Sequence, residues 1–248
     1  MIQIILYLCL LMFICMLYIL LKQKESFINK NKWAVIQFDN RPLTDEYKLL
    51  VEKNKEYCKK HNYTHIFEES KYENIPPYWI KVFMANDILT TKHENNEYLY
   101  DGIFWIDTDA VIHNHDIPIH MLSNKSFFCS PDPDYLGPSN FNAGVWGVRN
   151  TEQGRAILNE WIQLYNNIKS NWTKNGDSWS GNGEWAGEIY EQGAFNKFIL
   201  NSEKYKDNIE IFPYQKFQSI NLDKSDIFTL HFSLKRNDAL KDYINIIK

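Results

Sequence analysis

Residues 103–106 constrain the fold more than any other stretch, because they form a short apolar run with no polar residue in alternation. A strand of this kind is buried on both faces, so helices must cover both sides of its sheet. Similar apolar runs alternate along the chain with amphipathic helical patterns, at residues 33–38, 63–67, 141–148 and 227–232 for strands and 152–168 for a helix. Strands that alternate with helices predict a layered α/β domain with a mostly parallel sheet.

Local capping signals support this reading. Thr44 precedes a helical pattern with Asp45 and Glu46 in its first turn, where a hydroxyl cap and acidic residues stabilise a helix. Polar residues also follow three of the predicted strands, after residue 38, after residue 106 and at His231. Ligands of α/β sheets collect at the carboxyl ends of the strands, so we expect the functional site there.

The first residues of the chain form a continuous apolar run instead of an amphipathic pattern. Residues 2–21 carry no charge, and twenty helical residues span about 30 Å, the thickness of a bilayer core. They predict a transmembrane signal anchor, followed by a short stem at 22–32 and one domain at 33–248. A cleaved signal peptide is the alternative, but the basic n-region and an A-x-A site are missing.

The orientation of this anchor stays open. Lysines after the span favour a cytosolic domain, whereas sequons at Asn62, Asn124 and Asn171 favour a luminal one.

Composition excludes several classes of protein. Lys+Arg 27 against Asp+Glu 31, with no dense basic run, argues against a nucleic-acid partner. Four Cys without a C-x-x-C pair exclude a zinc ribbon. All eight Trp lie beyond residue 32, an excess that suits a sugar-binding site.

The sharpest chemical signal is the pair Asp107 and Asp109, which directly follows the buried run. Carboxylates one residue apart can share a divalent cation, and hard oxygen ligands suit Mn²⁺ or Mg²⁺. His231, at the end of a late strand, can supply a third ligand. A structural histidine is the alternative reading for that residue.

The same pair also fits the D-x-D-x-[TV] pattern of haloacid-dehalogenase-type phosphatases, with Asp107 as nucleophile and Asp109 as acid or base. That pattern normally follows the opening strand, whereas here other strands precede it. No later acidic pair completes the metal site of such an enzyme.

Two further motifs stand out. Residues 141–150, FNAGVWGVRN, place Gly144 and Gly147 in an apolar run, which indicates close approach of the backbone to another group, and Asn142 offers an amide to a sugar hydroxyl. Glu191 and Gln192 open an apolar helix. Each also has a structural alternative, a plain core strand and a first-turn acid respectively.

The order of these motifs resembles a known family. W-x-K at 79–81, then WIDTDAVI, FNAGVWGVRN, EQGAF and HF are similar to the motifs of plant xyloglucan α-xylosyltransferases and fungal Golgi α-galactosyl- and α-mannosyltransferases. The resemblance extends over residues 33–232. It implies a GT-A fold, a Rossmann-like nucleotide-diphospho-sugar transferase domain, behind a single-pass type II anchor with the enzyme in the Golgi or ER lumen.

The resemblance also implies roles for individual residues. Asp107, Asp109 and His231 would bind the metal, while Gln192, with Glu191 in place of the family's Asp, would act at the anomeric carbon. The residues that would bind the donor are Gln37, Asp39, Lys81, Asp107, Thr108, Asn142, Gly144 and Lys235. One departure is that Phe232 is followed by Ser233 rather than the family's A-G-C.

The implied reaction is transfer of a hexose or pentose from a UDP- or GDP-linked donor to a glycan or glycoprotein hydroxyl, with retention. Same-face attack is favoured over covalent catalysis by Glu191 or Glu188, which stays open. Trp179 and Trp185, on a glycine-rich stretch, are candidates for acceptor contacts. A non-catalytic, membrane-tethered glycan-binding protein is a further alternative, and a homodimer is left open.

Overall fold

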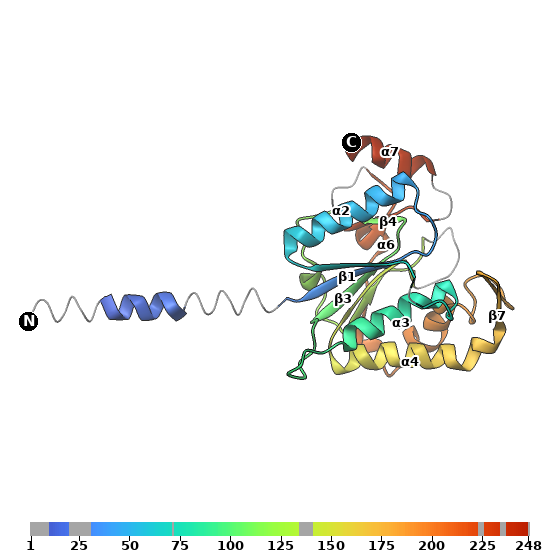
Figure 1. Ribbon diagram of the computed structural model, residues 1–248, viewed down its shortest axis with the longest axis horizontal. Helices are drawn as coiled ribbons and strands as arrows, with labels where there is room; N and C mark the ends of the chain where they lie inside the picture. Colours follow the sequence, from blue (N-terminus) through green and yellow to red (C-terminus); the bar gives the residue numbers. More distant parts are fainter. Residues whose placement is uncertain are drawn as a thin grey trace, which may run out of the picture.

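The computed structural model describes residues 10–19, 31–70, 72–133, 141–222, 226–233 and 237–247. At its centre is a six-stranded sheet with the strand order β2-β1-β3-β6-β5-β9 (Figure 1). Its strands are β1 (Trp33–Phe38), β2 (Thr64–Glu68), β3 (Gly102–Ile106), β5 (Phe127–Cys129), β6 (Val145–Arg149) and β9 (Ile209–Ile211).

The sheet is mixed rather than mostly parallel. β1 runs parallel to β2 and β3, and β5 runs parallel to β9, but β6 is antiparallel to both β3 and β5. A parallel pair needs a crossover connection, usually a helix, and the described part of the chain between β5 and β6 contains none. The prediction of a mostly parallel sheet was therefore right for the first half of the sheet and wrong around β6.

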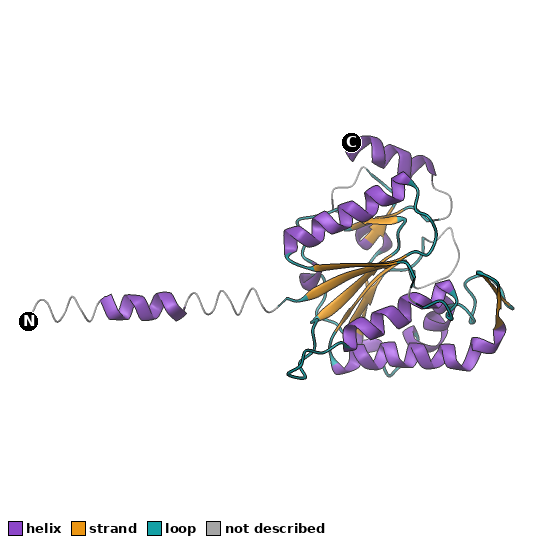
Figure 2. Ribbon diagram, in the orientation of Figure 1, coloured by secondary structure: helices purple, strands orange, loops and turns teal. Residues whose placement is uncertain are grey.

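Helices cover both faces of this sheet (Figure 2), namely α2 (Asp45–His61) on one face and α3 (Pro77–Thr90) with α4 (Glu152–Ile168) on the other. Alternate residues of β1 divide between the two layers. Ala34 and Ile36 pack in the cluster formed with α3 and α4, whereas Val35 packs in the cluster that contains residues of α2. A strand buried on both faces thus explains the apolar runs without alternation.

The helix starts follow the capping signals. The Thr44 hydroxyl accepts a hydrogen bond from the backbone N–H of Tyr47, and Thr151 caps α4 in the same way through Gly154. α3 instead begins with Pro77, whose fixed φ suits a first helical position. The predicted bounds of β1 and α4 are confirmed.

A second, smaller sheet has the order β10-β11-β4, from β4 (Ala110–Ile112), β10 (Gln218–Ser219) and β11 (Thr229–His231). β11 is antiparallel to β4 and pairs His231 with Ala110. The C-terminal helix α7 (Asn237–Ile247) packs on this sheet through Leu240 and Tyr243, together with Leu50 of α2. Since β4 follows closely after β3, the pairing of β11 with β4 places β11 near the end of β3.

The remaining elements are short. β7 (Trp172–Asn175) and β8 (Ser178–Gly181) form a hairpin within the glycine-rich stretch. α5 (Glu191–Ala194) continues into the π-helical η4 (Phe195–Leu200). Short elements complete the chain: η1 (Ile119–Met121), η3 (Lys169–Asn171), η5 (Lys206–Asn208) and α6 (Tyr214–Phe217).

Two predicted strands begin later than expected. The strand predicted at 227–232 comprises only Thr229–His231, and the one predicted at 141–148 also starts late. Residues 141–144 form a turn, and the strand begins only at Val145. The side-chain oxygen of Asn142 accepts a hydrogen bond from the N–H of Gly144 (2.8 Å), a local bond that competes with strand pairing.

Most of the predicted anchor at 2–21 and of the stem at 22–32 lies outside the described residues. Residues 10–19 form an α-helix. Within the described ranges, no helix combines the length and the apolar character needed to cross a bilayer.

Candidate active site

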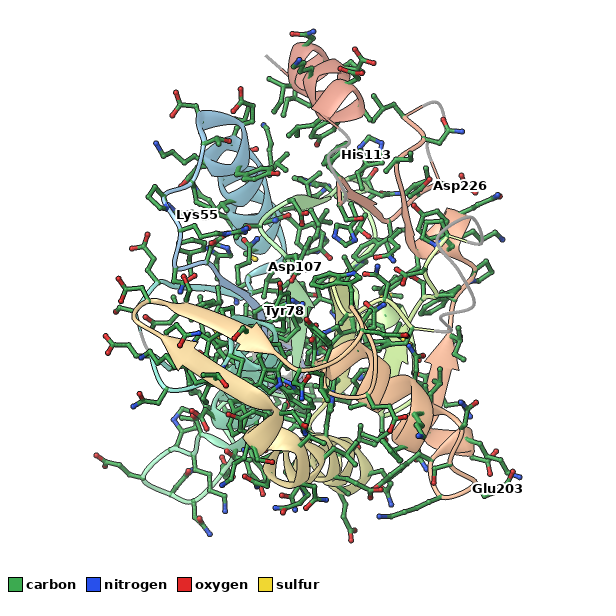
Figure 3. All side chains as sticks on the ribbon, turned by 90° about the vertical axis from the view of Figure 1, so that its right-hand side faces the viewer. Lys55, Tyr78, Asp107, His113, Glu203 and Asp226 are labelled. Carbon is green, nitrogen blue, oxygen red and sulfur yellow. The ribbon has the colours of Figure 1, made fainter. Side chains whose placement is uncertain are left out.

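A cavity of about 790 Å³ opens where β3 ends. Its lining brings together Asp107, Asp109 and His231 with Lys81 and Gln192, which come from four different parts of the chain. Figure 3 looks onto this side of the molecule, with Asp107 and Tyr78, another lining residue, labelled near its centre.

Two backbone hydrogen bonds fix the turn that follows β3. The N–H of Asp107 donates to the carbonyl of Gly144 (2.8 Å), and the carbonyl of Asp109 accepts from the N–H of Phe232 (2.9 Å). The turn is therefore tied to the residue that precedes β6 on one side and to the residue that follows β11 on the other. As a result, one ligand atom from each of Asp107, Asp109 and His231 lies within 4.8 Å of the others.

Gly144 leaves the space that His231 occupies. A Cβ at this position would lie 2.8 Å from Nε2 of His231, closer than side chains tolerate. The sequence predicted a close approach at Gly144 and Gly147. At Gly147 the neighbour is the ring of Phe128 in the core.

The imidazole and the second carboxylate each favour the charged form of the other. Nε2 of His231 lies 3.3 Å from Oδ1 of Asp109. Burial would raise the pKa of Asp109, but His231 lowers it below its ordinary value. Burial would likewise lower the pKa of His231, but Asp109 raises it. Once the imidazole has lost its proton, two carboxylates and a neutral imidazole form a donor set that suits a divalent cation.

Lys81 holds the first carboxylate. Its Nζ donates to Oδ1 (3.0 Å) and Oδ2 (3.3 Å) of Asp107 and to the carbonyl of Ala143 (3.0 Å). Nε1 of Trp105 donates to the same carboxylate at 2.7 Å. Burial would lower the pKa of Lys81, but Asp107 and Glu191 raise it, so the amine is a cation on the cavity wall.

Glu191 lies behind Lys81. Its carboxylate is buried, with Oε1 3.6 Å from Nζ of Lys81, and burial raises its pKa to about 7 although Lys81 acts to lower it. Among the described residues, Oε2 has no hydrogen-bond partner. A buried carboxylate in this setting is costly when it is ionised.

Gln192 is oriented by a residue that the sequence analysis did not single out. Its Nε2 donates to Oδ2 of Asp132 (2.7 Å), and its Oε1 accepts from the N–H of Ala143 (3.0 Å). Oδ1 of Asp132 accepts a hydrogen bond from Nδ2 of Asn142. Asp132 thus bridges two predicted site residues. The only sequence signal was an acid that follows β5 between two prolines.

Three of the predicted donor-binding residues support the site from outside the cavity lining. Nε2 of Gln37 donates to the backbone carbonyl of Asp107 (3.4 Å), and the hydroxyl of Thr108 donates to Oδ2 of Asp39 (2.7 Å). Burial would raise the pKa of Asp39, but its two hydrogen bonds from the Arg41 guanidinium lower it. This ion pair lies beside the turn that carries Asp107 and Asp109, because Asp39 also accepts the hydrogen bond from Thr108.

Residues 34–128 match the sequence model of the galactosyl transferase GMA12/MNN10 family. The matched part contains Lys81, Asp107 and Asp109 and ends before Asn142 and Gln192. No curated protein matches the chain.

Solved structures are similar at low sequence identity. A glycosyltransferase involved in the glycosylation of the major capsid of PBCV-1 has a TM-score of 0.61 at 14% identity, over 86% of this chain and 99% of that one. GlyE of Streptococcus pneumoniae has a TM-score of 0.42 at 13% identity, over 88% and 64% of the two chains. A mutant of Drosophila β1,4-galactosyltransferase 7, complexed with manganese, UDP-Gal and xylobiose, has a TM-score of 0.43 at 14% identity, over 84% and 73%.

The chain is a glycosyltransferase with the GT-A fold. The predicted resemblance to the galactosyl-, xylosyl- and mannosyltransferase family is thereby confirmed. Of the residues to which the resemblance gave roles, the cavity lining contains Lys81, Asp107, Asp109, Asn142, Gly144, Glu191, Gln192 and His231.

The remaining predicted residues have different outcomes. Trp185 lines the cavity, but Trp179, on β8, is not part of its lining. Lys235 lies outside the described residues, so its predicted role at the donor phosphate stays a prediction.

Proposed function

We propose that this glycosyltransferase is metal-dependent and retaining, and that it moves a hexose or pentose from a UDP- or GDP-linked donor to a glycan or glycoprotein hydroxyl. The observation that carries the proposal is the convergence of Asp107, Asp109 and His231 in the cavity that also contains Lys81 and Gln192.

The donor set fits Mn²⁺ or Mg²⁺, since it offers two carboxylates and an imidazole whose ligand atoms lie within 4.8 Å of one another. When bound there, the ion would neutralise the negative charge that grows on the departing diphosphate. The cation of Lys81 lies next to Asp107 and can contribute to the same stabilisation.

The protein groups favour attack on the same face of the donor over a covalent intermediate. Although Glu191 lines the cavity, its carboxylate is buried and pairs with Lys81, which makes it less available as a nucleophile. Gln192 is a weak nucleophile, but its amide oxygen can stabilise positive charge at the anomeric carbon. In this proposal the leaving phosphate accepts the proton of the acceptor hydroxyl, so the protein need not supply a base.

The direct test is release of nucleotide from UDP- and GDP-sugars in the presence of Mn²⁺. Gln192→Ala should lower this rate by about a hundredfold while donor affinity stays close to wild type, because electrostatic groups at a transition state contribute of that order. Gln163→Ala, the same change at an exposed position of α4, is the matched control. Asp109→Asn should abolish Mn²⁺-dependent donor binding. Full activity of the Gln192 variant would remove its catalytic role.

The alternatives predict different results. A haloacid-dehalogenase-type phosphatase would use Asp107 as a nucleophile, but here that carboxylate accepts hydrogen bonds from Lys81 and Trp105. Release of phosphate from p-nitrophenyl phosphate would favour that activity. Binding of a nucleotide-sugar without any turnover would favour a glycan-binding protein.

We also propose that residues 2–21 anchor the enzyme as a type II protein with the domain in the lumen. The charge-free run supports the anchor, and the sequon residues Asn62 and Asn124, which are exposed, and Asn171, which is partly exposed, are compatible with glycosylation. A mobility shift that is lost when all three Asn are changed to Gln would support this orientation. Protease sensitivity of the domain in intact microsomes would contradict it.

A further inference from the structure

One tryptophan of the domain differs from the others in its exposure. Six of the eight are buried, and Trp179 is partly buried. Trp185 is 64% exposed, although it lines the cavity that contains Asp107, Asp109 and Gln192. A large aromatic surface left open at the edge of a cavity is the kind of apolar exposure that marks a binding site.

Two tyrosines hold this ring in place. The ring centroids of Trp185 and Tyr78 lie 5.1 Å apart, and those of Trp185 and Tyr190 lie 5.2 Å apart, both with edge-on geometry. Tyr78 and Tyr190 are themselves 5.1 Å apart and also line the cavity. We call these three rings the aromatic platform. Because each ring contacts the other two, the platform has a defined orientation before any ligand binds.

The loop that carries Trp185 is fixed to the catalytic segment. Ala186 has a φ of 57°, a left-handed conformation that is costly for a residue with a side chain. Gly193, one residue after Gln192, has no side chain to separate it from this loop, and a Cβ there would collide with the carbonyl oxygens of Ala186 and Gly187. The platform therefore holds a constant position relative to Gln192.

The charge at this end of the cavity is balanced. Glu188 and Lys197 both line it and form an ion pair with each other. A paired acid and base give no net charge with which to select an anionic or cationic acceptor. An aromatic surface with a balanced rim fits a neutral ring whose faces are made of C–H groups, which is the chemistry of an uncharged pyranose.

We infer that the aromatic platform of Tyr78, Trp185 and Tyr190 is the acceptor subsite, and that it stacks against an uncharged pyranosyl residue of a glycan. This inference rests on the proposed transferase function and specifies its second substrate. It also distinguishes between the two tryptophans that the sequence suggested as acceptor contacts. Trp185 lines the cavity, whereas Trp179 lies in the hairpin outside the lining and takes no part in acceptor binding.

The test measures binding of simple sugars to the full-length protein with UDP and Mn²⁺ present. The probes are the methyl α- and β-glycosides of glucose, galactose, mannose and xylose, followed by saturation-transfer NMR and titration. At least one should bind the wild type. Trp185→Ala should weaken that binding by about tenfold, the usual contribution of one stacked aromatic ring, and Trp185→Phe should restore part of it.

Trp179→Ala is the matched control and should bind the same glycoside within about twofold of wild type. Affinity for UDP with Mn²⁺ should be unchanged in all three variants. The inference is overturned if no glycoside binds the wild type, if Trp185→Ala binds as well as wild type, or if Trp185→Ala loses UDP affinity instead, which would place a nucleobase on the platform.

Failure of the proposed function gives a separate result. In that case the wild type releases no nucleotide from any donor, while the Trp185-dependent binding of a glycoside still shows that the platform is a glycan site.

Discussion

Gly144→Ala is the change by which one methyl group should disable the proposed metal site while the fold survives. The added Cβ would collide with Cε1 of His231 and would lie 2.8 Å from its Nε2 and 2.9 Å from Oδ1 of Asn142. Ordinary contact begins near 3.4 Å, so relieving the Nε2 contact alone requires about 0.6 Å, and the closer Cε1 contact requires the imidazole to move further. Metal–ligand distances tolerate only about 0.2 Å of variation, so His231 could no longer act as a ligand.

The Mn²⁺ affinity is expected to fall by about tenfold to hundredfold, which corresponds to about 1.4 to 2.7 kcal/mol of binding free energy. Even a mutation of a residue that only positions a metal ligand weakens metal affinity by this amount. Calorimetric titration of Mn²⁺ into the protein with UDP measures it directly. His231→Ala should show a similar loss, and the double variant should lose little more, because both changes remove the same ligand.

Gly147→Ala is the control for a crowded glycine elsewhere in the same segment. Its Cβ would lie 2.5 Å from Cε2 of Phe128, in the core rather than at the site. This variant should lose about 1 to 3 kcal/mol of stability to urea from overpacking and keep its Mn²⁺ affinity. Wild-type Mn²⁺ affinity in a folded Gly144→Ala protein would refute the reasoning, as would an equal loss of affinity in both variants.

Three further changes test other parts of the structure. Asp132→Asn removes the carboxylate that bridges Gln192 and Asn142. Nucleotide release should therefore slow by about tenfold with little change in donor affinity, as expected for the loss of a charged hydrogen bond. An unchanged rate would show that Asp132 has no positioning role. Burial raises the pKa of Glu191 to about 7 from an ordinary value of 4.5, so the folded protein retains a proton that the unfolded chain loses. The stabilisation from this proton is complete below pH 4.5 and disappears as the pH rises through about 7. In urea unfolding without metal, the wild type should therefore lose about 3 kcal/mol of stability relative to Glu191→Gln over that pH range. Parallel pH profiles of the two proteins would contradict the assignment. Thr44→Ala should cost about 1 kcal/mol of stability without changing nucleotide release, because only the N-cap of α2 is lost.

Local patterns in the sequence predicted the elements well wherever one residue's neighbours decide its conformation. The bounds of β1 and α4 match the apolar run and the helical periodicity, and the Thr44 cap forms as expected. The turn at 141–144 was missed because a side-chain hydrogen bond of Asn142, rather than hydrophobicity, ends the strand pattern there. The direction of β6 was also hidden, since periodicity does not distinguish parallel from antiparallel pairing.

By itself, the sequence determined the layered α/β class, the carboxylates at the end of a buried strand and the order of motifs that resembles a transferase family. Only the tertiary structure decided which side chains meet. The pairing of β11 with β4 brings His231 to Asp109, the chain after β5 places Asp132 against Gln192, and packing of one loop on α5 puts Trp185 rather than Trp179 at the cavity. The physical reason is that periodicity and capping act over a few residues, whereas a binding site is made by contacts between segments far apart in the chain.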